Sequence, residues 1–218
     1  MSILRILGDS HGLQKRYYDI VKDCEYSVQL GDFGFNYDIL EKLNFENHKV
    51  LKGNHDNYDK DGPHFLGDFG PCQLGPHLFF FIRGGFSIDK KFRIEQEKKW
   101  GIKSYWEQEE LTAEESIEAI QLYNKIKPDF VLSHDVCTDI SEKIGRPEIL
   151  IYFGWNPGLI TPTQETLQTM FELHQPKLWV FAHYHYNCTL ELNGTKFVGL
   201  GELNWVDIDE QLEIVRRG

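Results

Sequence analysis

Short apolar runs that end abruptly in polar residues recur along the chain. Each run is about the length of a β-strand and is rich in β-branched or aromatic residues, as in "YSVQL", "HLFFFIR" and "KLWVFA". We therefore predict a strand at each run. The polar segments that follow them are Gly8-Asp9-Ser10-His11, Gly31-Asp32, Gly53-Asn54-His55-Asp56, Gly84-Gly85, Ser133-His134-Asp135 and His183-Tyr184-His185.

Helical patterns lie between several of these runs. "QKRYYDIVKD" and "YDILEKLNF" are modestly amphipathic, and "LTAEESIEAIQLYNKIK" is more strongly so. Thr112 and Glu115 have the spacing of a capping box at the start of that segment. "TPTQETLQTMFELH" combines Thr161 as N-cap with Pro162 at the first helical position and Gln164 three residues after the cap.

Strands that alternate with helices predict an α/β protein. The segment "CTLELNGTKFVGL" differs, because two alternating runs flank Asn193-Gly194, the commonest two-residue hairpin turn. We therefore expect a mixed sheet with an antiparallel portion late in the chain.

Length and composition favour one domain over residues 1–218, since 218 residues with 41% hydrophobic content can bury one substantial core. No apolar run approaches the roughly 20 residues of a membrane span. In the N-terminal "MSILRILGDS" the apolar stretch is too short for a secretory signal, because polar residues follow it within a few positions. A cytoplasmic protein without a membrane partner is the expectation. The four cysteines are scattered without a CxxC pair and are expected to be reduced thiols: Cys24, Cys72, Cys137 and Cys188.

A formal net charge of −11 argues against an extended groove for long nucleic acid, which needs many Lys or Arg contacts to phosphates. A small phosphorylated ligand remains compatible with this charge if cations are bound, because bound cations reverse the local field.

Residues able to bind metal follow almost every predicted strand, and ligands of open α/β sheets bind beyond the carboxyl ends of the strands. The candidates are Asp9, His11, Asp32, Asn54, His134, His183 and His185. Imidazole, carboxylate and amide donors without thiolate suit Mn²⁺, Fe²⁺ or Zn²⁺ and argue against a purely structural zinc site. Seven ligands are too many for one tetrahedral ion and fit two ions that share one carboxylate.

Taken singly, each candidate has an ordinary explanation. An Asp after Gly at a strand end is most often a turn or a helix cap. The pair His183 and His185 could lie on a surface strand. Their joint occurrence favours a metal site over these ordinary explanations. Several separate strand ends carry residue types that bind metal, and buried charges need partners or metals. No role is assigned to His48, His64, His77 or His174.

The ordered set of motifs closely resembles the calcineurin-like metallophosphoesterase family, in its phosphodiesterase-type, bacterial or phage-like branch. The matching segments, from position 8 to 185, are "GDSHG", "GD" at Gly31-Asp32, "GNHD", "SHD" and "AHYH". The resemblance implies two stacked mixed β-sheets flanked by α-helices, with a dinuclear site at the carboxyl ends of the strands.

The resemblance also implies a role for each matching position. Asp9, His11 and His185 would hold one metal ion. Asn54, His134 and His183 would hold the other, and Asp32 would bridge both. Manganese is the favoured metal, with iron, zinc and nickel as alternatives.

His55 would then serve catalysis instead of binding metal. With Asn54, it would contact the substrate, and it would either donate a proton to the leaving alkoxide or hydrogen-bond a phosphoryl oxygen. Asp56 would orient His55 and raise its proton affinity.

The implied reaction is hydrolysis of a phosphoric ester. A water between the ions would have its pKa lowered towards about 7, and the resulting hydroxide would attack phosphorus. A phosphodiester of a nucleotide, cyclic nucleotide or short RNA end is the main substrate hypothesis. A phosphomonoester or phosphoprotein is the alternative. The rival from another class is a metal-binding scaffold without turnover.

Several departures from the family pattern bear on these choices. "GDFGFN" follows Asp32 where the protein phosphatase branch has "GDxVDRG", so the Arg of that branch is missing, and its "GNHE" is "GNHD" here. Both departures favour the phosphodiesterase branch. Alanine replaces the usual glycine in "AHYH". Arg83 and Arg93 could reach phosphate, but surface roles are expected. Residues 87–110 are interpreted as a surface excursion, with a substrate-proximal flap as the alternative.

Overall fold

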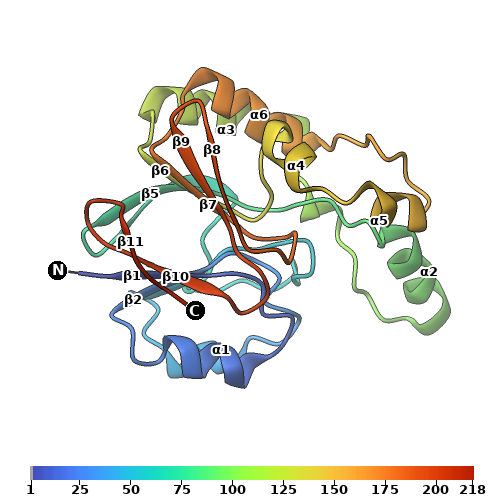
Figure 1. Cartoon of the computed structure of the whole chain (residues 1–218). Coiled ribbons are helices and arrows are strands. Elements are labelled where there is room, and N and C mark those ends of the chain that lie inside the picture. Colours follow the sequence, from blue (N-terminus) through green and yellow to red (C-terminus); the bar gives the residue numbers. More distant parts are fainter. Residues whose placement is uncertain (1) are drawn as a thin grey trace.

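The computed structural model describes residues 2–218, and its strands form two mixed sheets (Figure 1). Within the described residues the first sheet is five-stranded. Its strands β1, β2 and β3 run parallel, whereas β10 pairs antiparallel with β1 and β11. In sheet order they are β11 (Ile214–Arg217), β10 (Trp205–Ile208), β1 (Leu4–Leu7), β2 (Tyr26–Gln29) and β3 (His48–Val50).

The second sheet has six strands within the described residues. Strands β5, β6, β7 and β9 run parallel, and antiparallel edge strands β4 and β8 flank them. The pair β8 and β9 is the hairpin predicted at Asn193-Gly194. In sheet order the strands are β4 (Phe69–Leu74), β5 (His77–Ile82), β6 (Phe130–Ser133), β7 (Leu178–Phe181), β9 (Thr195–Gly199) and β8 (Cys188–Leu192).

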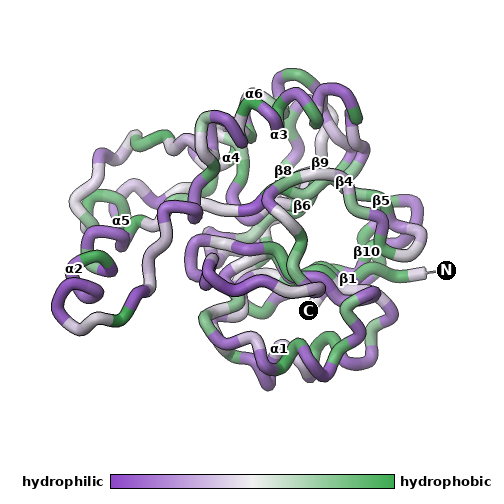
Figure 2. Tube along the Cα trace, turned by 180° about the vertical axis from the view of Figure 1, so that it is seen from behind, coloured by the Kyte–Doolittle hydropathy of each residue, from purple (hydrophilic) through white to green (hydrophobic). Residues whose placement is uncertain are grey.

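The two sheets stack face to face, and both faces of the second sheet are buried. Successive side chains of a strand point to opposite faces. On β5, Phe79 and Phe81 therefore enter the core between the sheets, whereas Phe80 and Ile82 enter the core beneath the helices. Figure 2 shows hydrophobic stretches in the strands between the helical layers. Burial on both faces explains why these strands are nearly continuous apolar runs.

Helices cover the outer faces of both sheets (Figure 1). Side chains of α3, α4 and α6 enter the core on the outer face of the second sheet, and α1 packs on the first. The helices are α1 (Gln14–Val21), α2 (Lys90–Trp100), α3 (Ala113–Ile126), α4 (Thr138–Ile144), α5 (Pro147–Tyr152) and α6 (Pro162–Leu173). Two stacked mixed sheets flanked by helices are the predicted fold class, which is confirmed.

The predicted caps are also present. Thr112 and Thr161 each accept a hydrogen bond from the backbone N–H three residues later, and Glu115 and Gln164 complete the two capping boxes. "YDILEKLNF" differs from the prediction, because it forms only a short 3₁₀ helix, η1 (Asp38–Lys42). Leu40 is the buried side chain of that 3₁₀ helix, and Tyr37, Ile39 and Leu43 pack partly buried against the same core.

Two further sequence expectations have structural counterparts. All four cysteines are free thiols. Within residues 2–218, none of the helices has the combined length and apolar character that a bilayer crossing needs.

Candidate metal centre

The predicted ligands converge where strands of both sheets end. Asp9 follows β1, Asp32 follows β2 and Asn54 follows β3, all in the first sheet. His134 follows β6, and His183 follows β7, in the second sheet. Because these strands within each sheet are parallel, their carboxyl ends share one edge, and the stacked sheets bring the two edges together.

One group of donors is formed by Asp9, His11, Asp32 and His185, whose ligand atoms lie within 4.8 Å of one another. His11 Nε2 lies 2.9 Å from His185 Nε2 and 3.8 Å from Asp32 Oδ2. His185 Nε2 lies 3.1 Å from Asp9 Oδ2.

A second group is formed by Asp32, His134 and His183 under the same 4.8 Å limit. His134 Nε2 lies 3.3 Å from Asp32 Oδ1 and 3.2 Å from His183 Nδ1. The amide oxygen of Asn54 joins this group, 3.0 Å from His134 Nε2. Asp32 is common to both groups, with Oδ2 towards the first and Oδ1 towards the second.

The donors fit a pair of divalent ions. Asp9 and Asp32 are 0% and 1% exposed, and Asp9 Oδ2 accepts no hydrogen bond from the described part of the chain. Buried carboxylates of this kind need a cation. His134 Nδ1 lies 2.7 Å from the Leu30 carbonyl, and donation there leaves Nε2 with a lone pair facing the site. Nitrogen and oxygen donors without thiolate suit Mn²⁺, Fe²⁺ or Zn²⁺.

Electrostatics of the group keep the shared carboxylate ionised. Burial opposes the charge on Asp32, but the imidazoles of His134, His55 and His11 hold its pKa well below the usual range. A charged Asp32 is the form that can bridge two cations.

Glycines precede Asp32 and Asn54 because the site leaves no room for a side chain there. A Cβ on Gly53 would lie 2.3 Å from Asp32 Oδ1, and one on Gly31 would lie 2.6 Å from His134 Nδ1. Gly31 also has φ +102°, a conformation that L-residues rarely adopt. The "GD" and "GN" pairs thus follow from close packing of the turns on the donors.

Several of the donors themselves have left-handed backbone conformations. The φ angles are 41° for His11, 54° for Asp32, 67° for His183 and 50° for His185. Such conformations cost of order 1–3 kcal/mol in non-glycine residues and concentrate at functional sites. Four of the seven candidate donors thus have this conformation, as do Lys127, Asn193, Leu203 and Leu212 elsewhere in the described residues.

His55 lies beside the donors, as the resemblance implied. Its backbone N–H donates to Asp32 Oδ1 over 2.7 Å, and its ring centroid lies 5.6 Å from that of His11. Burial lowers the pKa of His55, although Asp32 opposes this shift.

Asp56 has a different role from the one predicted. Its fully buried carboxylate accepts hydrogen bonds from the backbone N–H groups of Phe33, Gly34 and Gly53 and from the Tyr37 hydroxyl. The prediction that Asp56 orients His55 is therefore wrong: these four donors occupy the carboxylate. Asp56 instead ties the turn after β2 to the turn after β3.

The two arginines with expected surface roles are both buried, at 3% exposure for Arg83 and 4% for Arg93, so that expectation is wrong. Arg83 pairs with Asp68 and Glu115 and donates to the Gln108 carbonyl. Arg93 donates to the Asn54 carbonyl over 3.0 Å and to Glu109 Oε1 over 2.8 Å. Neither guanidinium is free, because Arg93 satisfies the buried acceptors of Asn54 and Glu109, and Arg83 is held by partly exposed acceptors.

Ser87 and Glu109 support the metal centre, and the sequence analysis did not single them out. The Asn54 amide donates to Ser87 Oγ over 3.1 Å, and Ser87 Oγ donates to Glu109 Oε2. With Arg93 they fix both the side chain and the backbone of Asn54. The interpretation of residues 87–110 as a surface excursion is thus wrong for its two ends, which pack behind a candidate ligand; α2 and the 3₁₀ helix η2 (Glu107–Glu109) lie between.

No family model matches the sequence, and no curated protein matches it. Solved structures do resemble it. A phosphopantetheinyl hydrolase from Mycobacterium tuberculosis has TM-score 0.49 at 11% identity, over 92% of this chain and 90% of that one. A predicted phosphoesterase from Streptococcus pneumoniae has TM-score 0.43 at 12% identity, over 100% and 98%. The GAP50 anchor of the inner membrane complex of Plasmodium has TM-score 0.47 at 10% identity, over 100% and 88%.

The fold is the one that the resemblance to calcineurin-like metallophosphoesterases implied. Stacked mixed sheets, with donor-bearing turns at one edge of each, are the architecture expected from the motifs. At TM-scores of 0.43–0.49 these likenesses carry no argument about this chain, and the roles of individual residues are argued from its own geometry.

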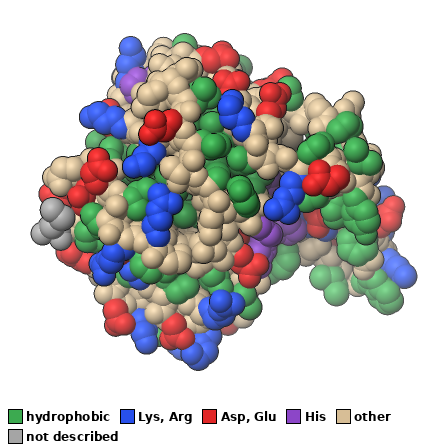
Figure 3. Space-filling model, in the orientation of Figure 1, with side chains coloured by type: hydrophobic (Ala, Val, Ile, Leu, Met, Phe, Trp, Pro, Cys, Tyr) green, Lys and Arg blue, Asp and Glu red, His purple; other side chains and the backbone are tan. Residues whose placement is uncertain are grey.

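A cavity of about 380 Å³ opens directly onto the candidate centre. Asp32, Asn54, His55, His183 and His185 line one end of it. Figure 3 shows histidine side chains at the bottom of a recess between the body of the molecule and the lobe that contains α2 and α5. A small ligand can therefore reach the donors from solvent.

Proposed function

We propose that this protein is a phosphoesterase that uses two divalent metal ions and prefers phosphodiesters, such as those of a nucleotide, a cyclic nucleotide or a short RNA end. The observation that carries the proposal is the convergence of two donor groups on the shared, buried carboxylate of Asp32. Two ions that share one carboxylate form the arrangement that suits in-line displacement at phosphorus.

Each ion would have its own donors. Asp9, His11, Asp32 and His185 would hold one, and Asp32, Asn54, His134 and His183 would hold the other. When bound, such ions supply positive charge that stabilises the phosphoryl oxygens in transfer, and they make water more acidic.

His55 would act on the substrate. It lines the cavity beside Asp32 and Asn54, and its backbone bond to Asp32 fixes its position relative to the donors. From there its ring N–H would hold a phosphoryl oxygen or deliver a proton to the leaving oxygen.

Departures from the protein phosphatase branch favour a diester over a monoester. The Arg that this branch uses to hold phosphate is missing after Asp32, and the guanidiniums of Arg83 and Arg93 are engaged with acceptors of the protein. Arg146 lines the cavity, where its guanidinium would meet the anionic ester.

Hydrolysis of bis-p-nitrophenyl phosphate and of p-nitrophenyl phosphate, each with Mn²⁺ added, tests the proposal. We expect turnover of the diester at a higher kcat/KM than the monoester, followed by activity on a panel of nucleotides, cyclic nucleotides and 2′,3′-cyclic RNA ends. A clear preference for the monoester would overturn the diester assignment. No turnover of either with Mn²⁺, Fe²⁺, Zn²⁺ or Ni²⁺ would favour the scaffold alternative.

A further inference from the structure

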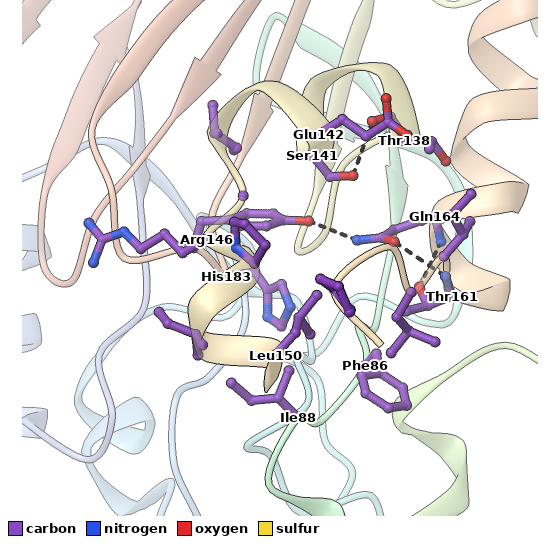
Figure 4. Close-up of a pocket in the computed structure, with 18 of the residues that line it drawn as sticks. Phe86, Ile88, Thr138, Ser141, Glu142, Arg146, Leu150, Thr161, Gln164 and His183 are labelled. Atoms are coloured by element: carbon purple, nitrogen blue, oxygen red, sulfur yellow. Dashed lines mark hydrogen bonds between the residues drawn. The ribbon is translucent and has the colours of Figure 1, made fainter. Parts of the chain in front are cut away.

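The cavity beside the candidate centre continues from its polar end along an apolar wall. Phe86 and Ile88 from the segment before α2, Leu150 from α5, and Leu159 and Ile160 from the segment before α6 line this wall. Figure 4 shows Phe86, Ile88 and Leu150 around the same space as His183. The donors and the wall therefore face one ligand volume.

The wall is held in place across the cavity. Trp155, shortly after α5, donates from Nε1 to the Ile88 carbonyl over 2.6 Å, and its ring centroid lies 5.0 Å from that of Phe86. Lys91 Nζ lies 3.9 Å from the centre of the Trp155 ring. The α5 segment is thus fastened to the segment before α2, and these contacts hold the lining residues on both segments in place.

Three polar side chains of the cavity lining, those of Gln164, Tyr184 and Ser141, are paired with protein groups, whereas the exposed Glu142 and Arg146 line it as well. Gln164 accepts from the Thr161 N–H and donates to the Tyr184 hydroxyl over 2.9 Å. The Tyr184 hydroxyl donates to Asp135 Oδ1 over 2.7 Å. Ser141 Oγ donates to the Thr138 carbonyl. These contacts, some of them dashed in Figure 4, leave the wall suited to apolar contact.

We propose that this wall binds the ester group of the substrate, and that this group is bulky and apolar, with an aromatic ring as the best fit. The inference rests on the proposed function, because the phosphate must lie among the donors for its ester group to reach the wall. A volume of about 380 Å³ is at the small end of ligand pockets and accommodates a phosphate with one ring system.

The apolar wall also limits which parts of a nucleotide the protein could recognise. The apolar side chains of the wall would hold a nucleobase by its faces. The exposed side chains of Glu142 and Arg146 also line the cavity and could meet the polar edges of a ligand. The wall itself would therefore select for a flat apolar group.

Binding of two product analogues to the Mn²⁺-loaded protein tests the inference. Phenylphosphonate and methylphosphonate carry a C–P bond that resists hydrolysis, and calorimetric titration above their second ionisation gives both dissociation constants. We expect phenylphosphonate to bind about tenfold more tightly, because its ring is removed from water.

Neighbouring residues of α5 provide a matched pair of variants. Leu150 lines the cavity, whereas Ile151 is 59% exposed and does not. Leu150→Ala should reduce the preference for phenylphosphonate to about threefold or less and leave methylphosphonate affinity unchanged. Ile151→Ala should keep the tenfold preference. Ile88→Ala, which removes another apolar side chain of the wall, should repeat the effect of Leu150→Ala if that variant proves unstable.

The possible outcomes separate the two proposals. Equal affinities for the two phosphonates in the unaltered protein, or a preference that survives both Leu150→Ala and Ile88→Ala, would overturn the apolar pocket and leave the metal centre standing. Failure of both phosphonates to bind the Mn²⁺-loaded protein would overturn the pocket and the proposed function together.

Discussion

Gly53 lacks a side chain because Asp32 fills the space in which one would lie. A Cβ there would approach Asp32 Oδ1 to 2.3 Å and the Asp32 backbone nitrogen to 2.6 Å. Neither atom can move without disturbing the carboxylate that both donor groups share. Gly53 has no side chain, yet its position is as tightly constrained by the site as that of Asn54, the candidate ligand beside it.

Gly53→Ala should therefore lower both stability and metal affinity. We expect a loss of about 2–3 kcal/mol from overpacking, which corresponds to roughly 5–10 °C in Tm for a chain of this size. Calorimetric melting with and without Mn²⁺ measures both effects. Gly62→Ala is the control, because its Cβ would meet nothing nearer than Phe65 Cδ2 at 3.9 Å. Similar melting of the two variants would contradict the steric account.

His55→Ala should separate catalysis from metal binding. His55 lies in the cavity but belongs to neither donor group. We expect metal content close to that of the unaltered protein and a loss of about 10²–10⁴ in kcat for esters with poor leaving groups, the usual contribution of a general acid or base. Esters of p-nitrophenol should lose less.

His64→Ala provides the comparison for His55→Ala, since His64 contacts the Leu43 carbonyl and does not line the cavity. Steady-state kinetics with metal analysis of each purified variant decides the matter. Unchanged turnover in His55→Ala, or loss of metal from it, would remove His55 from its proposed role.

At the scale of elements, α2 and η2 support Asn54 from behind. Arg93 on α2 pairs with Glu109 on η2, and both side chains are at most 5% exposed. Removing the arginine would leave the buried Glu109 with the Ser87 hydroxyl and the Trp106 N–H as donors but without a counter-charge, and breaking a buried ion pair in this way costs about 3–5 kcal/mol.

Arg93→Met should accordingly destabilise the protein by about that amount and weaken Mn²⁺ binding at the donor group that contains Asn54. Urea unfolding and metal titration measure the two effects. Lys98→Met, an exposed basic residue on the same helix, should change neither. Equal unfolding free energies and equal Mn²⁺ affinities in the two variants would mean that the contacts of Arg93 with Asn54 and Glu109 contribute to neither.

The ligand-bearing turns could be predicted from sequence because each signal is local. An apolar run shows where a strand ends, and parallel strands end at one edge, so Asp32 and Asn54 could be expected near each other without knowing any packing. Capping residues such as Thr112 can be predicted for the same reason, because a capping box is defined by two residues only three positions apart.

Other features depend on contacts that no local pattern records. Arg93 and Glu109 are 16 residues apart and meet only because α2 folds back on the body. Asp56 was assigned to its neighbour in sequence, His55, whereas it bonds mainly to residues 33–37. Helix α5 has no fully buried side chain, and so no amphipathic period to predict it.

At the scale of the whole molecule, the candidate centre joins the two sheets and so couples metal binding to folding. Asp9 and Asp32 come from the first sheet, and His134 and His183 come from the second. Burying the two carboxylates is unfavourable without a counter-charge, and a cation held jointly with the imidazoles of the second sheet would offset that cost.

Mn²⁺ should therefore raise the melting temperature. A ligand at about 100 times its dissociation constant stabilises the folded state by about 2.7 kcal/mol, which is roughly 5–10 °C here. Chelation with EDTA should reverse the shift. Asp32→Asn should abolish it, and Asp38→Asn, an exposed carboxylate elsewhere, should retain it. A full shift in Asp32→Asn would exclude Asp32 as the shared donor.

The chain order of the donors has a consequence for synthesis on the ribosome. Each donor group includes a histidine from the segment after β7, and β1 pairs with β10 through Leu4 and Ile208. A nascent chain can complete neither donor group until His183 and His185 have emerged. Asp9 and Asp32 are therefore synthesised well before the histidines that would share a cation with them, so either donor group could bind metal fully only after the segment that follows β7 has emerged.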